Sequence, residues 1–376
     1  MNARRISADA LRPFAEQVFV RIGYPHDQAT DAADVLLWAS LRGVDTHGVR
    51  NLKSYYADRT LEGLLRPQSQ TRVEHQTSHT ACLDGDSGLG LACACRAMRL
   101  AIDKSRSSGV GIVCVRNTHH LGAAGYFAHM AVEHGMLGLC TTGHFFGKGH
   151  SIGIAPLGSF LPMFSTNPLS FAAPCGRHAP FVLDMSTSVA TVNRIEMHAQ
   201  ESRLIPAGWA CDAGGNSTTD PTAARVLLPL GGTAELGGHK GAGLAMMVSI
   251  LSGVLSGAWA PVERTRADAI PTAPTSASTV ETQSDQYDQP TMGHFFAALQ
   301  IGAFQPLDHF RSAMDAMIDA LHAAPVSDPN RKLCYPGEIE FATAAERTKH
   351  GIPINDRLFD ELQALAELLE LEMPQM

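Results

Sequence analysis

The chain has 376 residues, about twice the length of a typical single domain, so we expect two closely packed domains or one large domain with an attached lobe. Hydrophobic residues make up 45% of it and charged residues only 18%, with a formal net charge of −8, which disfavours nucleic acid and anionic membranes as partners. An enzyme acting on a small molecule fits better, and the 17 histidines indicate either a metal site or a site of proton transfer.

The first 75 residues are predicted to be helical. Ser7 can cap a helix whose apolar face repeats over 11–22, and Gly23 is placed to end that helix. The same pattern recurs over 31–41 ahead of Gly43. Both helices need a partner to cover their apolar faces.

From about residue 80 the pattern changes to alternating helices and strands. Helices are expected over 89–106 and 121–134, and strands over 110–115 and 136–141. This βαβ-like spacing favours an α/β sheet. A further strand over 181–184 precedes Met185-Ser-Thr-Ser188, whose hydroxyl groups suit the N-cap of a helix.

The last third of the chain contains one irregular segment between two helical regions. A glycine-rich loop at 231–243 opens a long apolar helix. Residues 260–292 are rich in Pro, Ser and Thr, which predicts a mobile excursion or a loop at the rim of an active site. Asn355 can cap a C-terminal helix with one stripe of leucines. We therefore divide the chain into a helical segment (1–75), a catalytic α/β domain (76–300) and a C-terminal helical segment (301–376) that packs with the first.

The cysteines and the uncharged segment favour a cytoplasmic protein without a membrane anchor. The eight cysteines show no Cys-x-x-Cys spacing and lie mostly in apolar runs, as buried thiols in a reducing compartment do. The N-terminus leads into an amphipathic helix instead of the apolar core of a signal peptide. The uncharged stretch 241–262 is long enough to span a bilayer, but its Gly, Ser and Ala content and Pro261 favour a buried helix.

The common cofactor and metal motifs are absent. No Gly-x-Gly-x-x-Gly follows a strand: in Gly85-Asp-Ser-Gly88-Leu-Gly90 the glycines stand in the wrong order, and Gly232–Gly237 is followed by Gly238 where a P-loop needs Lys. His119 and His120 are adjacent, so they point in different directions, and no His-x-x-x-His or carboxylate triad accompanies them. We therefore predict no metal.

Three segments place chemically useful groups at the end of an element. In Asp45-Thr46-His47-Gly48-Val49-Arg50-Asn51 an imidazole stands beside a hydroxyl and a carboxylate, with a cation that could bind a substrate carboxylate. The alternative is a turn capped by Asp and Thr. In 117–125 a loop precedes a helix whose free N–H groups could hold a phosphate, and ordinary capping is the alternative.

The third segment, Asp184–Ser188, joins a strand to a hydroxyl-rich turn. A buried Asp184 could orient a histidine, although an N-cap that satisfies backbone donors explains the same residues. The later run Gly237-Gly-His239-Lys240-Gly241 offers backbone donors and a cation for an anion, or simply a glycine loop.

Taken together, these segments resemble the malate/L-lactate dehydrogenase family that lacks a Rossmann fold. The similarity covers nearly the whole chain. Its matching strings, in order, are Leu41-Arg-Gly-Val-Asp-Thr-His-Gly-Val49, Val115-Arg-Asn-Thr-His-His-Leu-Gly-Ala-Ala-Gly125, Ser165-Thr-Asn-Pro-Leu-Ser-Phe171, Val182-Leu-Asp-Met-Ser-Thr-Ser188, Ile205-Pro-Ala-Gly-Trp209, Thr218-Thr-Asp-Pro221, Gly237-Gly-His-Lys-Gly241 and Tyr335-Pro-Gly-Glu338.

The resemblance implies a non-Rossmann NAD(P)-binding domain with a mixed sheet and a helical domain built from both chain ends. It implies a homodimer that uses NAD or NADP to interconvert a 2-hydroxy acid and its 2-keto acid. His47 would exchange the proton, held and polarised by Thr46 and Asp184, with His119 as the alternative proton acceptor. The residues that would contact the substrate are Arg50, Asn51, Tyr55 and Thr141. Those that would contact the cofactor are His119, His120, Leu121, Gly122, Ala123, Asp184, Met185, Ser186, Thr187, Ser188, His239, Lys240, Gly337 and Glu338.

Two departures from the family pattern bear on the substrate. The family commonly has Arg four residues after its catalytic His, where this chain has Asn51 and carries Arg50 one place earlier. The stretch His144-Phe-Phe-Gly-Lys148-Gly-His150 also replaces a shorter one that contains Pro. Three alternatives stay open: a cyclic imino-acid reductase of the same family, a member that binds cofactor with lost or altered activity, and a metal-dependent lyase.

Overall fold

The computed structural model describes residues 4–143, 153–259, 292–328 and 330–375. The helices are α1 (Ala8–Arg21), α2 (His26–Leu41), α3 (Asp58–Leu61), α4 (Gly90–Ser108), α5 (Ala124–Val132), α6 (Val192–Gln200), α7 (Gly238–Ser249), α8 (Leu307–His322), α9 (Glu338–His350) and α10 (Asp356–Leu369). The strands are β1 (Arg4–Ile6), β2 (Arg72–Gln76), β3 (Thr80–Gly88), β4 (Val110–Thr118), β5 (Met136–Gly143), β6 (Gly153–Ile154), β7 (Leu169–Ala173), β8 (Phe181–Met185), β9 (Ala210–Cys211), β10 (Ser217–Thr218), β11 (Val226–Leu227), β12 (Met292–Gln300) and β13 (Ile352–Ile354).

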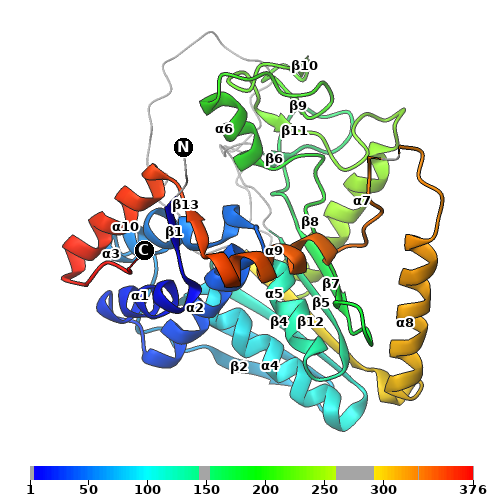
Figure 1. Ribbon diagram of the computed structural model, residues 1–376, viewed down its shortest axis with the longest axis horizontal. Helices are drawn as coiled ribbons and strands as arrows, with labels where there is room; N and C mark the ends of the chain where they lie inside the picture. The colour runs from blue at the N-terminus through cyan, green and yellow to red at the C-terminus, as the bar shows by residue number, and fades with distance from the viewer. Residues whose placement is uncertain (1–3, 144–152, 260–291, 329, 376) are drawn as a thin grey trace, which may run out of the picture.

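A seven-stranded mixed sheet forms the centre of the molecule (Figure 1), in the order β2-β3-β4-β12-β5-β7-β8. Only β3 and β4 run parallel, joined by the crossover helix α4. The strand β12 comes from late in the chain yet lies between β4 and β5, antiparallel to both. The α/β class with a mixed sheet is thus confirmed.

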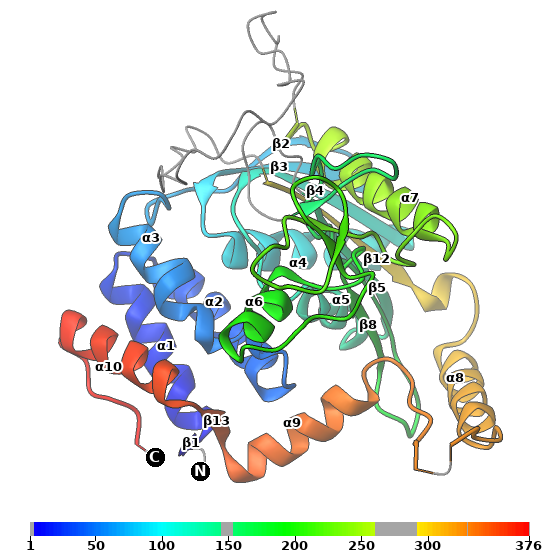
Figure 2. The ribbon, with the colours of Figure 1, turned by 90° about the horizontal axis from the view of Figure 1, so that it is seen from above.

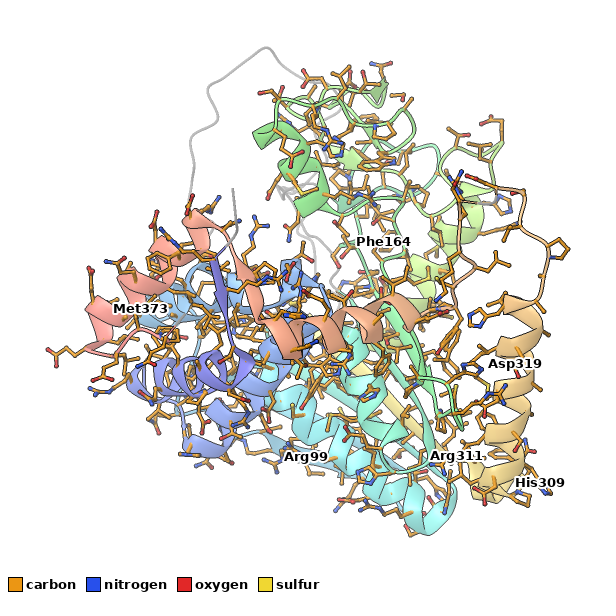
Figure 3. The ribbon with its side chains drawn as sticks, in the orientation of Figure 1. Arg99, Phe164, His309, Arg311, Asp319 and Met373 are labelled. Carbon is orange, nitrogen blue, oxygen red and sulfur yellow. The ribbon has the colours of Figure 1, made fainter. Side chains whose placement is uncertain are left out.

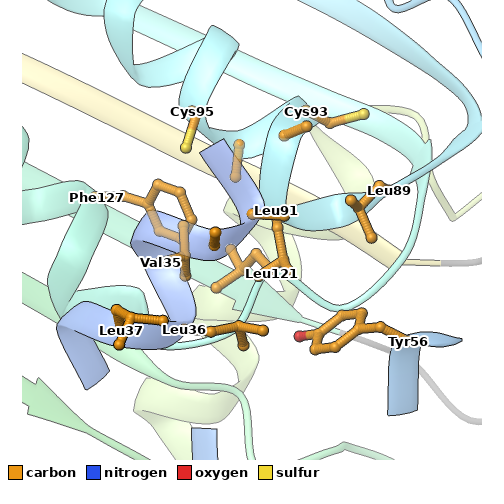
Figure 4. Packing of buried hydrophobic residues seen from close by; sticks show 14 of the residues in the cluster. Val35, Leu36, Leu37, Tyr56, Leu89, Leu91, Cys93, Cys95, Leu121 and Phe127 are labelled. Carbon is orange, nitrogen blue, oxygen red and sulfur yellow. The ribbon is translucent and has the colours of Figure 1, made fainter. Parts of the chain in front are cut away.

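Helices cover the two faces of this sheet differently. On one face, α4 and α5 join α1 and α2 in the main apolar core, where Leu91, Leu121 and Phe127 are completely buried (Figure 4). On the other face, Cys114 and Phe295 pack against Leu251, which follows α7. Because successive side chains of a strand point to opposite faces, β4 and β12 supply residues to both layers.

A smaller lobe is built from the short strands β10-β9-β11-β6 and the helix α6. Its apolar cluster includes Ile154, Ile195 and Phe164, the last of which is labelled in Figure 3. No separate lobe was expected at this point of the chain.

The two ends of the chain meet through β1 and β13, which pair antiparallel with Ile6 opposite Ile352. The helix α1 also contacts α10, and α2 contacts α9. The helix α8, by contrast, lies at the opposite side of the molecule from α10 (Figure 2). Its Ile318 packs with Cys175 and Tyr335, so the prediction that all of 301–376 packs on the N-terminal segment is wrong for α8.

The predicted boundary at residue 75 is also wrong, because it cuts β2, an edge strand of the large sheet. All five side chains of β2 are exposed, so no apolar alternation marked it in the sequence. Other local predictions are confirmed: the Ser7 side chain caps α1 and the Asn355 side chain caps α10. The segments 144–152 and 260–291 lie outside the described residues. The unusual His144–His150 stretch and most of the predicted loop at 260–292 fall within these two segments.

All eight cysteines are free thiols, six of them buried. Within the described residues, no helix combines the length and apolar character needed to cross a bilayer.

Candidate active site

A pocket of about 500 Å³ lies between the helical segment that follows α2, the loop after β4 and the start of α6. This volume is typical of small-molecule sites. The pocket brings together predicted site residues from two distant segments, His47, Arg50, Asn51 and Tyr55 with His119, His120 and Gly122. It is also lined by Arg59, Thr142, Ser165 and Glu196, and by Arg357 and Glu361 from α10.

His47 sits in a 3-10 turn, Asp45–His47, that the end of α2 holds in place. The Ser40 hydroxyl accepts the Val49 N–H at 2.9 Å, and Arg347 of α9 makes two hydrogen bonds to the Asp45 carboxylate. Asp45 therefore faces Arg347 and not the imidazole. The turn is tied to both ends of the chain before any substrate binds.

The immediate contacts of His47 are Thr46 and His120. The Thr46 hydroxyl lies 2.9 Å from His47 Nδ1, and the His47 ring stacks on His120 with ring centroids 5.5 Å apart. The Asn51 amide donates to the Thr46 carbonyl at 2.9 Å, so this side chain stabilises the turn that carries His47. Removal from water lowers the pKa of His47 to about 4, which leaves the imidazole neutral near pH 7.

His120 has a defined hydrogen-bonding pattern. Its Nδ1 accepts the Gly122 N–H at 3.1 Å and lies 3.2 Å from the Tyr56 hydroxyl, so the proton of the neutral ring is on Nε2. Burial lowers the pKa of His120 to about 3, helped by repulsion from His47 and His294. Tyr55 lies beside this ring, with centroids 5.0 Å apart.

His119 lines the same pocket, and its buried Nε2 has no hydrogen-bond partner among the described residues. Burial lowers the pKa of His119 to about 4. An unpaired buried nitrogen is costly unless a ligand uses it, so His119 is a candidate contact for a substrate or cofactor. The neighbouring Leu121 and Ala123 are buried in the core, so only their backbone atoms can reach a cofactor.

Asp184 does not contact His47, so the predicted role of holding that imidazole is wrong. Its Oδ2 accepts the Gly125 N–H at 2.7 Å, at the start of α5. The same bond removes a donor that the sequence assigned to a cofactor phosphate. The strand β8 contacts α5, so the Asp184 carboxylate lies where the 119–123 loop enters α5. His47 instead contacts this loop at His120.

The hydroxyls of Ser186, Thr187 and Ser188 do not cap a helix. The Thr187 hydroxyl donates to the carbonyls of Thr166 and Asn167, each 3.1 Å away, and Ser188 donates to Ala190. Ser188 forms an isolated β-bridge with Pro229, and α6 begins later, with Thr191 as its cap. These residues fix the strand end beside the pocket.

Thr141 is wrongly predicted as a substrate contact. Its side chain is completely buried, and its hydroxyl lies 2.7 Å from that of Ser252 on the far face of the sheet. Because side chains alternate along a strand, the next residue, Thr142, lines the pocket instead.

The predicted cofactor residues of the α7 region lie outside the pocket but are connected to its wall. His239 and Lys240 are exposed at the start of α7. A Cβ on Gly241 would lie 2.2 Å from the Leu230 carbonyl oxygen, so only glycine permits this approach. Leu230 in turn donates its N–H to the Thr187 carbonyl at 2.8 Å. The Met185–Ser188 turn and the start of α7 therefore form one connected structure.

Gly337 and Glu338 lie at the start of α9. Gly337 has a φ of 98° and approaches the Val182 backbone nitrogen. The Glu338 carboxylate pairs with Lys332 at 2.7 Å and His322 at 2.9 Å. The hydrogen bond to His322 joins α9 to α8, and the ion pair is with Lys332 of the segment between them, so the described contacts of Glu338 are structural.

One residue that the sequence patterns did not single out is His294, on the central strand β12. It is completely buried: Nε2 donates to the His119 carbonyl at 3.1 Å, and Nδ1 lies 2.8 Å from the Thr142 hydroxyl. The signal available in the sequence was a histidine inside the apolar run Gly293-His-Phe-Phe296. Among the described residues, no group of His, Cys, Asp and Glu side chains is arranged to hold a metal ion.

A mixed α/β fold whose pocket gathers neutral histidines and guanidinium groups is typical of an enzyme that acts on a small anionic molecule. The family model described as malate/L-lactate dehydrogenase matches residues 6–363, and the chain belongs to this family of oxidoreductases. It is 36% identical over 375 residues to a malate dehydrogenase of Pyrococcus horikoshii, covering 99% of this chain and 97% of that protein. It is 30% identical to an L-sulfolactate dehydrogenase of Methanothermobacter thermautotrophicus over 369 residues, covering 98% of each chain.

Comparison with solved structures agrees with this family assignment. The structure of the Pyrococcus horikoshii malate dehydrogenase matches with a TM-score of 0.82 at 34% identity, covering 99% of this chain and 97% of that one. A malate dehydrogenase of Entamoeba histolytica matches with a TM-score of 0.87 at 27% identity over the full length of both chains.

Proposed function

We propose that the protein is an NAD(P)-dependent dehydrogenase that interconverts a small 2-hydroxy acid and its 2-keto acid, with His47 exchanging the proton. One observation carries this proposal: the neutral imidazole of His47 lies in the same pocket as the guanidinium group of Arg50, which has no ion-pair partner among the described residues. A 2-hydroxy acid presents a hydroxyl beside a carboxylate, and these two groups match that pair of side chains.

The residues of the pocket divide the work. Arg50 binds the carboxylate next to the reacting carbon and orients the substrate. The neutral His47 accepts the hydroxyl proton during oxidation and returns it during reduction. Thr46 holds the His47 ring through Nδ1, and His120 packs against its face. A bound anionic substrate raises the pKa of His47, so the protonated form becomes available for reduction.

When bound, a nicotinamide supplies the hydride acceptor or donor. The chain offers groups that fit such a dinucleotide. The exposed Asp184 keeps Oδ1 free of partners among the described residues and suits a ribose hydroxyl, while the exposed Lys240 suits a phosphate. Five of the six strand pairings in the large sheet are antiparallel, which supports binding without a Rossmann fold.

The test is turnover by the purified full-length protein. NADH and NADPH are offered separately with a panel of 2-keto acids and cyclic imino acids, and oxidation of the cofactor is followed at 340 nm. We expect reduction of at least one 2-keto acid, with one cofactor preferred. Cofactor binding without turnover of any compound would contradict the proposal and favour a member with lost activity.

We also propose a homodimer. Large apolar side chains are exposed along α7 and the π-helical turn Ile250–Val254 that continues it, including Met246, Ile250, Val254 and Leu255. Exposed apolar patches of this kind mark interaction surfaces, and a second copy is the partner that we propose. Light scattering should give twice the chain mass, and Ile250→Glu should lower it; a monomer in both samples would contradict the proposal.

The free state of all eight thiols supports a further proposal, location in the reducing cytoplasm. Cell fractionation tests it.

A further inference from the structure

We propose that Arg59 is a specificity residue that binds a second anionic group, so that the protein prefers 2-hydroxy acids with two negative charges over those with one. This inference rests on the proposed function, because Arg50 is taken to bind the carboxylate beside the reacting carbon. The second group is a carboxylate or a sulfonate at the far end of the substrate.

The position of Arg59 is set by an unusual stretch of helix. Arg50 and Arg59 are nine residues apart, and in an α-helix, at about 100° per residue, they would point in opposite directions. Here Leu52–Ala57 forms a π-helical turn, which takes more residues per turn and changes the direction of everything after it. As a result Arg50 and Arg59 both line the pocket.

Neither guanidinium group has an ion-pair partner among the described residues. The adjacent Asp58 carboxylate is bound by Lys53, with both oxygens within 2.9 Å of Nζ. Arg357, the other cation of the pocket, is paired with Glu361 at 2.9 Å. Arg59 lies over the Tyr55 ring, 5.3 Å from its centroid, and that ring also contacts His120. The half-buried charge of Arg59 is therefore fixed beside the histidines and left uncompensated.

Of the two acidic side chains that line the pocket, Glu361 is paired with Arg357, and the other opposes a dianion. Glu196 on α6 has no partner among the described residues, but it is exposed, so water and salt weaken its field. The half-buried positions of Arg50 and Arg59 make their charges less screened. A substrate with one carboxylate pairs only one of these two cations, whereas a dianion pairs both.

The experiment compares oxaloacetate, a dianion, with pyruvate and 2-oxobutyrate, which are monoanions, on the wild type and on Arg59→Gln. We expect the wild type to prefer oxaloacetate, and Arg59→Gln to lose about ten- to one-hundred-fold of that preference, as expected for one charge-assisted hydrogen bond. The loss should appear mainly in KM for oxaloacetate, with the values for the monoanions nearly unchanged. Arg59→Lys should recover part of the preference, and Arg66→Gln, the same charge change outside the pocket, should have no effect.

Equal losses for all three compounds, or no loss, would overturn the proposal. Calorimetric titration with malate and lactate separates it from the proposed function. Suppose that no compound is turned over, and that Arg59→Gln binds malate more weakly than the wild type but binds lactate equally well. This result would support the role of Arg59 and would reject the dehydrogenase reaction. Unchanged malate binding would reject the role of Arg59.

Discussion

The His294 imidazole donates a hydrogen bond from Nε2 to the carbonyl oxygen of His119, 3.1 Å away. Because a carbonyl oxygen can only accept, the proton of the neutral ring is on Nε2, and Nδ1 is left to accept from the Thr142 hydroxyl. This contact ties the central strand of the sheet to the loop that carries two pocket histidines. It makes the position of that loop depend on the protonation of a buried ring.

The stability of the protein should therefore fall on acidification. Burial lowers the pKa of His294 to about 4, below the ordinary value of 6.5, so between these values the unfolded chain binds a proton that the folded chain does not. The contribution of His294 is present above pH 6.5 and is lost as the pH falls to 4, by about 3 kcal/mol. Urea unfolding of the wild type and His294→Gln from pH 7 to 4.5 measures it.

We expect the variant to show a flatter dependence on pH than the wild type. His75→Gln, at an exposed position on β2, should keep the wild-type slope. Parallel curves for wild type and His294→Gln would mean that the buried ring does not control acid stability.

Replacing His47 should remove catalysis but not cofactor binding. His47→Ala deletes the proposed proton acceptor, and losses of about 10²- to 10⁴-fold in kcat are usual for such a group. The dissociation constant for NAD(P)H, from fluorescence titration, should change little. Unchanged turnover would exclude His47 from the mechanism and leave His119 as the candidate.

Two substitutions of Asn51 should have different effects. Asn51→Ala loses the hydrogen bond to the Thr46 carbonyl, so we expect kcat to fall about tenfold for every substrate, because His47 is less well held. Asn51→Arg adds a cation to the pocket wall and should change the relative rates across a panel of keto acids. Identical relative rates for the wild type and Asn51→Arg would show that position 51 does not contact the substrate.

A matched pair of glycine substitutions in α7 tests the connection between that helix and the pocket wall. Gly241→Ala places a Cβ 2.2 Å from the Leu230 carbonyl oxygen and should lower the free energy of unfolding by about 2 kcal/mol or more. Gly243→Ala meets no atom within 4 Å and should raise it by about 0.5–1 kcal/mol through better helix propensity. Denaturant unfolding of both variants measures the difference, and equal stabilities would contradict the close packing.

The sequence by itself determined the features that depend on near neighbours. The caps at Ser7 and Asn355, the strand and helix alternation from residue 80 and the grouping of His47 with Arg50 followed from short patterns, because capping and amphipathic periodicity are local effects. The family string Val115–Gly125 also led to the pocket residues His119 and His120, and the family resemblance led to Tyr55.

Only the tertiary structure decided which of these groups face each other. Thr142 replaced Thr141 because strand alternation, set by the register of β5 against β12, turns one of the two toward the pocket. His294 reaches His119 across 175 positions of the chain, and a π-helical turn brings Arg59 into the pocket beside Arg50. Such contacts depend on sheet order and helix phase, which arise from packing over the whole chain and leave no short pattern in the sequence.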